Sequence, residues 1–180
     1  QAAKWSTMTG GQNNPAVTIR SIINRGGEQG AQHSQSLHNW FVHIPGLKVV
    51  MPSSVADARD LLISSVLCED PVVFIDDRWL YEIEDNLEPI KEIKLEDIKP
   101  KLIYKGNDCT VVSSSYSTHL AIEASKKLEK DNIKVDLYDL RVLNPFDHKD
   151  ILNSFLKTKK LIVIDGGTKT GGFSSEVITR

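Results

Sequence analysis

The sequence contains little cysteine and no motif built on it. Only Cys68 and Cys109 occur among 180 residues, far apart in the chain and outside any CxxC pair. We therefore expect two buried free thiols rather than a disulfide, which suits a reducing compartment. Zinc-ligand spacing is absent, and so is the nucleophile elbow of a Ser-His-Asp hydrolase, so neither chemistry is predicted.

A basic excess and long apolar runs are also missing. The formal net charge is −2, which argues against a general nucleic-acid binder. No apolar run has the length needed to span a bilayer, and no signal-peptide pattern begins the chain, so no membrane partner is expected. These absences favour a cytoplasmic protein, or one of the mitochondrial or plastid matrix in a eukaryote.

The two ends of the chain resemble interrupted helices. Residues 1–5 have the composition of the last turns of a helix, and residues 171–180 that of a helix just begun. This pattern predicts an internal segment of a longer polypeptide.

Two halves of the chain show the same order of elements. In the first half, residues 16–23, 46–52 and 71–75 are predicted strands, and Ser54-Val-Ala-Asp57 is a capping box that begins a helix. Apolar strands joined through helices predict a parallel sheet covered on both faces. Residues 82–100 are rich in charge and lack periodicity, which predicts a connector.

The second half repeats this order with strands at residues 109–113, 133–138 and 160–164. A helix is predicted over residues 119–130, and another is expected to begin at Pro145. The buried faces expected for these helices consist of Leu120, Ala121, Ala124 and Leu128, and of Ile151, Leu152, Phe155 and Leu156. The prediction is therefore an α/β fold of two doubly wound domains with mainly parallel sheets, at residues 1–82 and 106–180, joined by a linker at 83–105.

The segment of residues 26–35 contains the principal candidate site. Three glycines in five positions allow a close approach of the backbone to a ligand. They precede His33, whose side chain can exchange protons near neutral pH. Neighbouring amide and hydroxyl side chains can hold the ring in one tautomer. We favour a functional role for His33 over the alternative of a histidine that only stabilises its own loop.

Three further features carry weaker predictions. His38 and His43 are five residues apart, which does not match the spacing of a helical metal pair, and His43 is expected to end a helix. The glycine-rich loop at 166–172 is either an anion site at a helix start or a surface loop near an interface. Asp76 and Asp77 are expected to pair locally with Arg78.

Five segments of the chain are similar to one known family. They are Gly30–Ser36, His43–Pro52, Asp70–Phe74, Asp139–Asp147 and Asp165–Phe173. Together they resemble the beta subunit of the thiamine-diphosphate-dependent component of 2-oxo-acid dehydrogenases, of the pyruvate, branched-chain and acetoin type, in the transketolase superfamily. The resemblance implies part of a pyrimidine-binding domain followed by part of a transketolase C-terminal domain.

The resemblance also implies an activity, cofactors and partners. It implies oxidative decarboxylation of a 2-oxo acid with thiamine diphosphate, and transfer of the acyl group to lipoamide on an acyltransferase. The family works as an α2β2 heterotetramer, in which the alpha subunit holds the diphosphate through magnesium. His33 corresponds to the active-site histidine, and Gln32 and Gly30 lie in the loop that faces the cofactor.

The family often holds a structural potassium ion as well. The corresponding positions here are Ser65, Val66, Cys68 and Asp70, and Cys68 stands where relatives commonly have Asp. The glutamate that activates the cofactor lies upstream of this segment in the family. The segment alone is therefore not expected to be catalytically competent.

Two alternatives remain open. The chain could belong to a transketolase or deoxyxylulose-phosphate synthase relative that transfers ketol groups between sugar phosphates, with Lys169 as the one candidate phosphate ligand. It could also be a non-catalytic scaffold of the same fold.

Overall fold

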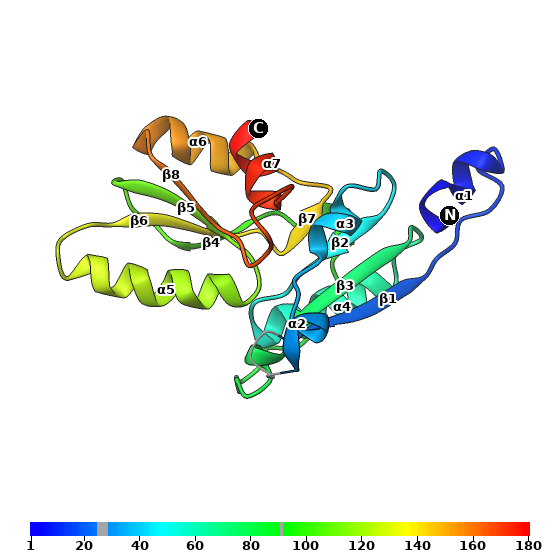
Figure 1. The fold of residues 1–180 in the computed structure, drawn as a ribbon, viewed down its shortest axis with the longest axis horizontal. Helices are drawn as coiled ribbons and strands as arrows, with labels where there is room; N and C mark the ends of the chain where they lie inside the picture. The colour runs from blue at the N-terminus through cyan, green and yellow to red at the C-terminus, as the bar shows by residue number, and fades with distance from the viewer. Residues whose placement is uncertain (25–28, 91) are drawn as a thin grey trace.

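The computed structural model describes residues 1–24, 29–90 and 92–180 as two four-stranded sheets with helices around them (Figure 1). The first two glycines of the predicted site segment, and Glu28, lie outside the described residues. The chain begins with the helix α1 (Ala2–Met8). No helix in the described part of the chain is both long and apolar enough to cross a membrane.

The first sheet has the strand order β1-β3-β2-β7. Strands β1 (Thr18–Ile23) and β2 (Lys48–Val50) both pair in parallel with β3 (Val72–Asp77). The fourth strand, β7 (Val142–Asn144), comes from the second half of the chain and pairs antiparallel with β2. The first sheet is therefore completed by a segment that the sequence places in the other half.

The second sheet has the strand order β4-β6-β5-β8. Its bounds are β4 (Lys101–Tyr104), β5 (Cys109–Ser113), β6 (Val135–Asp139) and β8 (Leu161–Ile164). The strands β6 and β8 flank β5 in parallel, and β4 joins β6 antiparallel. In Figure 1, the helix α5 (Tyr116–Glu129) covers one face of this sheet, and α6 (Lys149–Thr158) and α7 (Phe173–Thr179) lie on the other.

The capping box of the first half forms the predicted helix start. The Ser54 side chain accepts a hydrogen bond from the backbone N–H of Asp57 at the beginning of α4 (Val55–Val66). The prediction that a helix begins at Pro145 is wrong. Helix α6 begins at Lys149, whose backbone N–H donates to the side chain of Asp147.

Several predicted inward-facing residues lie in solvent instead. The exposed fraction is 44% for Leu120, 39% for Leu152 and 52% for Leu156, and Ala124 is exposed too. Small hydroxyl residues take the buried positions, because their side chains bind one another and need little space. In α6, for example, the hydroxyls of Ser154 and Thr158 lie 2.7 and 2.8 Å from that of Thr110.

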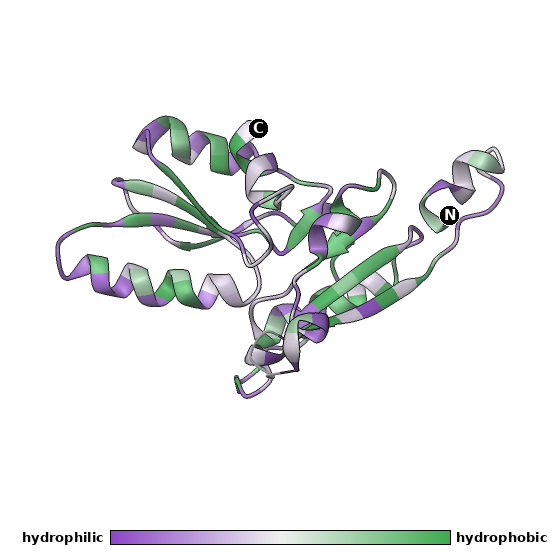
Figure 2. Ribbon diagram, in the orientation of Figure 1, coloured by the Kyte–Doolittle hydropathy of each residue, from purple (hydrophilic) through white to green (hydrophobic). Residues whose placement is uncertain are grey.

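One hydrophobic core crosses the two halves. Figure 2 shows hydrophobic residues concentrated in the strands. The largest buried cluster joins Val49 and Val73 of the first sheet to Val112 of the second and to Phe173 of α7. Both cysteines are free and buried, as predicted. The halves are thus packed against each other through shared apolar surface.

Candidate functional site

His33 lies at the end of a single helical turn, α2 (Gly30–His33), which follows the carboxyl end of β1. Because β1 and β3 are parallel, their carboxyl ends meet at one edge of the sheet, where ligands bind in open α/β folds. The His33 side chain is exposed, and no described residue forms a hydrogen bond, ion pair or ring contact with it. Gln32 and Gly30 are exposed beside it.

A second histidine of the same segment joins the two halves. His38 begins the helix α3 (His38–Val42), and its side chain is only 2% exposed. Its Nδ1 lies 2.8 Å from the Ser36 hydroxyl, and its Nε2 lies 3.0 Å from Oδ1 of Asp165, which follows β8. Nε2 forms no hydrogen bond among the described residues, so its contact with the carboxylate is electrostatic.

Asp165 is held by its own half of the chain. Its two carboxylate oxygens accept the backbone N–H groups of Gly167, at 2.9 Å, and of Ser174, at 3.1 Å. Burial opposes the charge of this carboxyl group, but His38 and the two backbone donors outweigh it and hold the pKa of Asp165 below its usual value. Asp165 is therefore a fixed anion facing His38.

Another aspartate joins the halves in a different way. Asp139, at the end of β6, is fully buried and accepts hydrogen bonds from the hydroxyls of Ser53 in the first half and Thr118 in α5. Nearby, the His119 ring lies 2.5 Å from the Ser53 carbonyl oxygen. Burial, aided by the charge of Asp57, raises the pKa of Asp139 to about 7.

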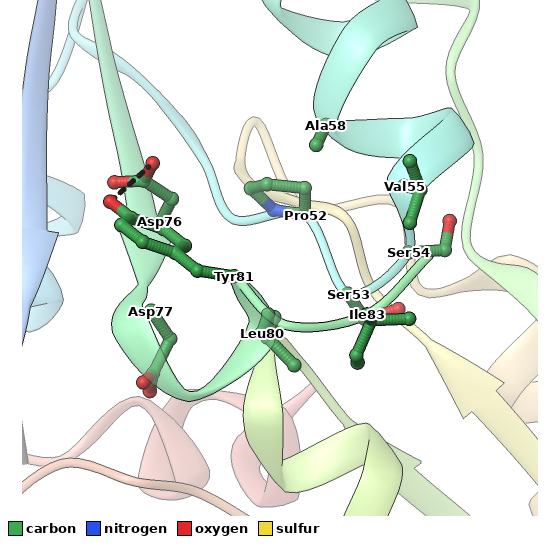
Figure 3. Close-up of a pocket in the computed structure, with 10 residues that line it drawn as sticks. All are labelled: Pro52, Ser53, Ser54, Val55, Ala58, Asp76, Asp77, Leu80, Tyr81 and Ile83. Carbon is green, nitrogen blue, oxygen red and sulfur yellow. Dashed lines mark hydrogen bonds between the residues drawn. The ribbon is translucent and has the colours of Figure 1, made fainter. Parts of the chain in front are cut away.

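A pocket of about 200 Å³ lies between the start of α4 and the end of β3 (Figure 3). Asp76 and Tyr81 line one side of it, joined by a hydrogen bond of 3.1 Å. Asp76 also pairs with Arg20 at 2.6 Å. The prediction of local pairing with Arg78 is wrong for Asp76, because the neighbouring strand β1 brings Arg20 alongside.

The positions named for potassium lie at the end of α4 and in the loop before β3. The Ser65 carbonyl accepts the Thr18 hydroxyl at 2.8 Å. The Lys48 ammonium lies 3.3 Å from Cys68 Sγ and 3.1 Å from both Asp70 and Glu96. Across the residues that the structure covers, no group of three or more His, Cys, Asp or Glu side chains could hold a metal ion. The potassium site stays a prediction, and Lys48 already supplies a positive charge beside it.

Family models match both halves of the chain. A model of the transketolase pyrimidine-binding domain matches residues 1–83, and a model of the transketolase C-terminal domain matches residues 99–180. The chain belongs to the transketolase family. A solved structure of a split-gene transketolase, described as an inactive beta4 tetramer, has the same fold with a TM-score of 0.77 at 22% identity, over 91% of this chain and 52% of that one. The predicted fold class of this transketolase-family chain is thereby confirmed.

Curated relatives agree with the resemblance to beta subunits. The chain is 35% identical to subunit beta of acetoin:2,6-dichlorophenolindophenol oxidoreductase from Cupriavidus necator, over 98% of the chain and 52% of the relative. It is 34% identical to the pyruvate dehydrogenase E1 component subunit beta of Rhizobium meliloti, over 99% and 39%. It is 33% identical to the mitochondrial 2-oxoisovalerate dehydrogenase subunit beta of Dictyostelium discoideum, over 98% and 48%. This transketolase-family chain spans about half the length of these relatives or less.

The sequence identified one histidine of the site segment and missed the contact of another. For His38 the sequence indicated only that its spacing does not suit a metal pair. For Asp165 it indicated only the start of a glycine-rich loop. The prediction that His43 ends a helix is confirmed, since it caps α3. The pairing of His38 with Asp165 had no local signal, because the two residues meet only when the two sheets pack together.

Proposed function

We propose that this chain is the beta-subunit portion of a thiamine-diphosphate-dependent enzyme that oxidatively decarboxylates a 2-oxo acid. The observation that carries the proposal is the similarity, along nearly the whole chain, to beta subunits of a pyruvate dehydrogenase, a 2-oxoisovalerate dehydrogenase and an acetoin oxidoreductase. These relatives are named for different substrates, so the 2-oxo acid of this chain is left open by the comparison. The complete protein works with an alpha subunit, and the acyl group passes to a lipoyl-bearing acyltransferase.

The residues of the His33 segment fit one side of a shared cofactor site. The His33 ring is exposed without a described partner, and no described atom lies within 4 Å of where a Cβ of Gly30 would stand. Gln32 is exposed between them and can bind a polar group. Thiamine diphosphate, when bound, supplies the carbanion chemistry of such enzymes. Magnesium and the diphosphate are assigned to the alpha subunit, and potassium to the loop of Ser65, Val66, Cys68 and Asp70.

We assign proton control to His33. An imidazole that titrates near neutral pH can hold or deliver a proton at the reacting carbon of the substrate, and such transfer contributes about 10²–10⁴-fold to a rate. The ring reaches solvent in this chain, which is the side where a second subunit and a substrate can approach. A cytoplasmic or organelle-matrix location belongs to the same proposal.

The decisive experiment uses the full-length protein together with its alpha partner. We expect thiamine-diphosphate-dependent release of CO₂ from pyruvate, 2-oxoisovalerate or a related 2-oxo acid. His33→Ala should lower the overall rate by at least about 100-fold, whereas His148→Ala, at the start of α6, should not. Ketol transfer between sugar phosphates would instead favour the transketolase alternative. Normal turnover by His33→Ala would remove the role assigned to His33.

A further inference from the structure

The helix that carries His33 cannot hold its own position. Helix α2 has four residues and the following α3 has five, whereas an isolated helix needs about 12–15 residues to be even marginally stable in water. None of the residues of α2 is buried. The position of the His33 ring must therefore be set by the contacts of residues on either side of it.

The firmest of these contacts lies just after His33. Between residues 29 and 42, only Ser36 and His38 are buried. Ser36 is bound to Nδ1 of His38, at 2.8 Å, so the chain turns tightly around the imidazole ring. On the preceding side, the side chain of Asn24 donates to Gln29 at 2.6 Å, which leaves His33 between two tethered points.

The partner of His38 is rigid. Asp165 accepts backbone N–H groups from Gly167 and Ser174, and these bonds fix the direction of the carboxylate that lies 3.0 Å from Nε2 of His38. The His38 ring is thus held on both sides, by the Ser36 hydroxyl at Nδ1 and by this carboxylate near Nε2.

The loop after β8 is shaped to lie close over the His38 ring. A Cβ at Gly167 would come within 2.9 Å of Cε1 of His38 and 3.0 Å of the Asn39 amide nitrogen. Real Cβ atoms almost never come so close, and a buried ring cannot easily move away. The absence of a side chain at Gly167 therefore permits this contact between the halves.

We propose that His38 and Asp165 form a positioning pair that holds the His33 loop against the second half of the chain in its working geometry. His38 acts through His33 and touches no substrate itself. The inference rests on the function proposed above, because the pair matters for catalysis only if His33 is a catalytic residue. Misplacement of a reacting group by about 1 Å can cost about 100-fold in rate, so a loop without helical support needs such a tether.

The test compares two substitutions of His38 in the complete enzyme with its alpha partner. His38→Leu fills similar space without a donor, and we expect kcat for the 2-oxo acid to fall about 10- to 100-fold while KM changes less than about threefold. His38→Gln retains an N–H that reaches Asp165, and its kcat should stay within about threefold of the wild type. His148→Gln, the same change at the start of α6, serves as the matched control.

A double-mutant cycle tests whether the two residues act as one unit. Asp165→Asn should lower kcat, and the variant with both His38→Leu and Asp165→Asn should be no slower than the slower single variant. Full multiplication of the two losses would show independent roles and overturn the pair. A rise in KM at unchanged kcat would assign His38 to substrate binding and overturn it as well.

Hydrogen exchange of the same full-length protein separates this inference from the proposed function. His38→Leu should speed exchange of the backbone amides of residues 29–37 by at least about tenfold, while those of β5 stay protected as an internal reference. Unchanged exchange in residues 29–37 would overturn the tether. If the wild-type enzyme decarboxylates no 2-oxo acid, the proposed function fails, while the exchange result still decides whether the pair holds the loop.

Discussion

Two aspartates join the halves of this molecule, and their pKa values are shifted in opposite directions. Asp165 faces His38 and two backbone donors, which stabilise its negative charge. Asp139 is fully buried and has the carboxylate of Asp57 nearby, and these outweigh its hydroxyl donors and raise its pKa. Asp139 ends a strand of the second sheet and Asp165 follows one. The comparison shows that burial opposes the charge of both carboxyl groups, and that the groups around each of them decide the direction of the net pKa shift.

The largest effect is expected where the charge is compensated. Asp165→Ala removes the partner of His38 and leaves two backbone N–H groups without an acceptor. We expect a loss of about 3–5 kcal/mol in the free energy of unfolding at pH 7, because each donor left without a partner costs about 1–3 kcal/mol. Urea unfolding of the full-length protein measures it. A loss below about 1 kcal/mol would show that the contact with His38 contributes little.

The second prediction is a gain in stability, and it concerns Asp139. The folded-state pKa of about 7 lies above the unfolded value of about 3.9. Between these values the folded chain keeps a proton that the unfolded chain has released, so stability falls as pH rises through this window. Asp139→Asn cannot ionise, and it should stabilise the protein by about 4 kcal/mol at pH 8 and by little at pH 4.

Urea unfolding at a series of pH values measures the difference between Asp139→Asn and the wild type. Asp165→Asn is the matched control, because its folded pKa is lowered. The stability that Asp165 supplies is present above the unfolded pKa and is lost as pH falls through the folded pKa. Parallel pH profiles for the two variants would contradict the contrast between the junctions.

A third, smaller effect is expected at Gly167. Gly167→Ala places a methyl group against the His38 ring, and such overpacking costs about 1–3 kcal/mol. In a background of His38→Ala the same substitution should cost little, because the ring is gone. Thermal unfolding of the four proteins of this cycle measures the coupling, and an equal cost in both backgrounds would rule out the steric explanation.

The smallest effect is expected at Thr118. Thr118→Val removes one of the two hydroxyls that bind Asp139, and a single buried hydrogen bond contributes about 1 kcal/mol. The loss should be larger at pH 8 than at pH 5, since the hydroxyl helps most when the carboxylate is charged. Urea midpoints at these two pH values provide the measurement, and Thr179→Val, at the exposed end of α7, is the control.

The sequence predicted the parallel strands well, including β1 and β8 at the sheet edges, and missed the two antiparallel strands, β4 and β7. Runs such as Val72–Ile75 are apolar throughout because they are buried on both faces, so their composition alone predicts a strand. Strand β4 contains Lys101 and lies in the charged connector, and β7 is only three residues long. Both form strands because β2 and β6 offer them hydrogen-bonding partners. The local sequence of β4 or β7 therefore does not predict the strand by itself.

The candidate site shows the same limit of local sequence patterns. Glycines beside a histidine marked His33 because that signal is contained within ten residues. The contacts of His38 and Asp139 are made with residues that come close only when the two sheets pack together. The periodicity of the sequence does not indicate such contacts. The prediction of the buried helix faces was partly wrong for a related reason. The buried hydroxyls of Ser154 and Thr158 both bind the Thr110 hydroxyl, and an apolar periodicity does not indicate such polar buried positions.

The strand β7 has a consequence for the synthesis of the protein. It is the outer strand of the first sheet, yet it follows every strand of that sheet by many residues and lies beyond β6 in the chain. A ribosome therefore releases β1, β2 and β3 while the edge of β2 still lacks its neighbour. An open strand edge invites wrong pairing. The free edge of β2 therefore stays exposed until β6 and then β7 have been synthesised, so the first sheet is completed only when most of the second half of the chain has been made.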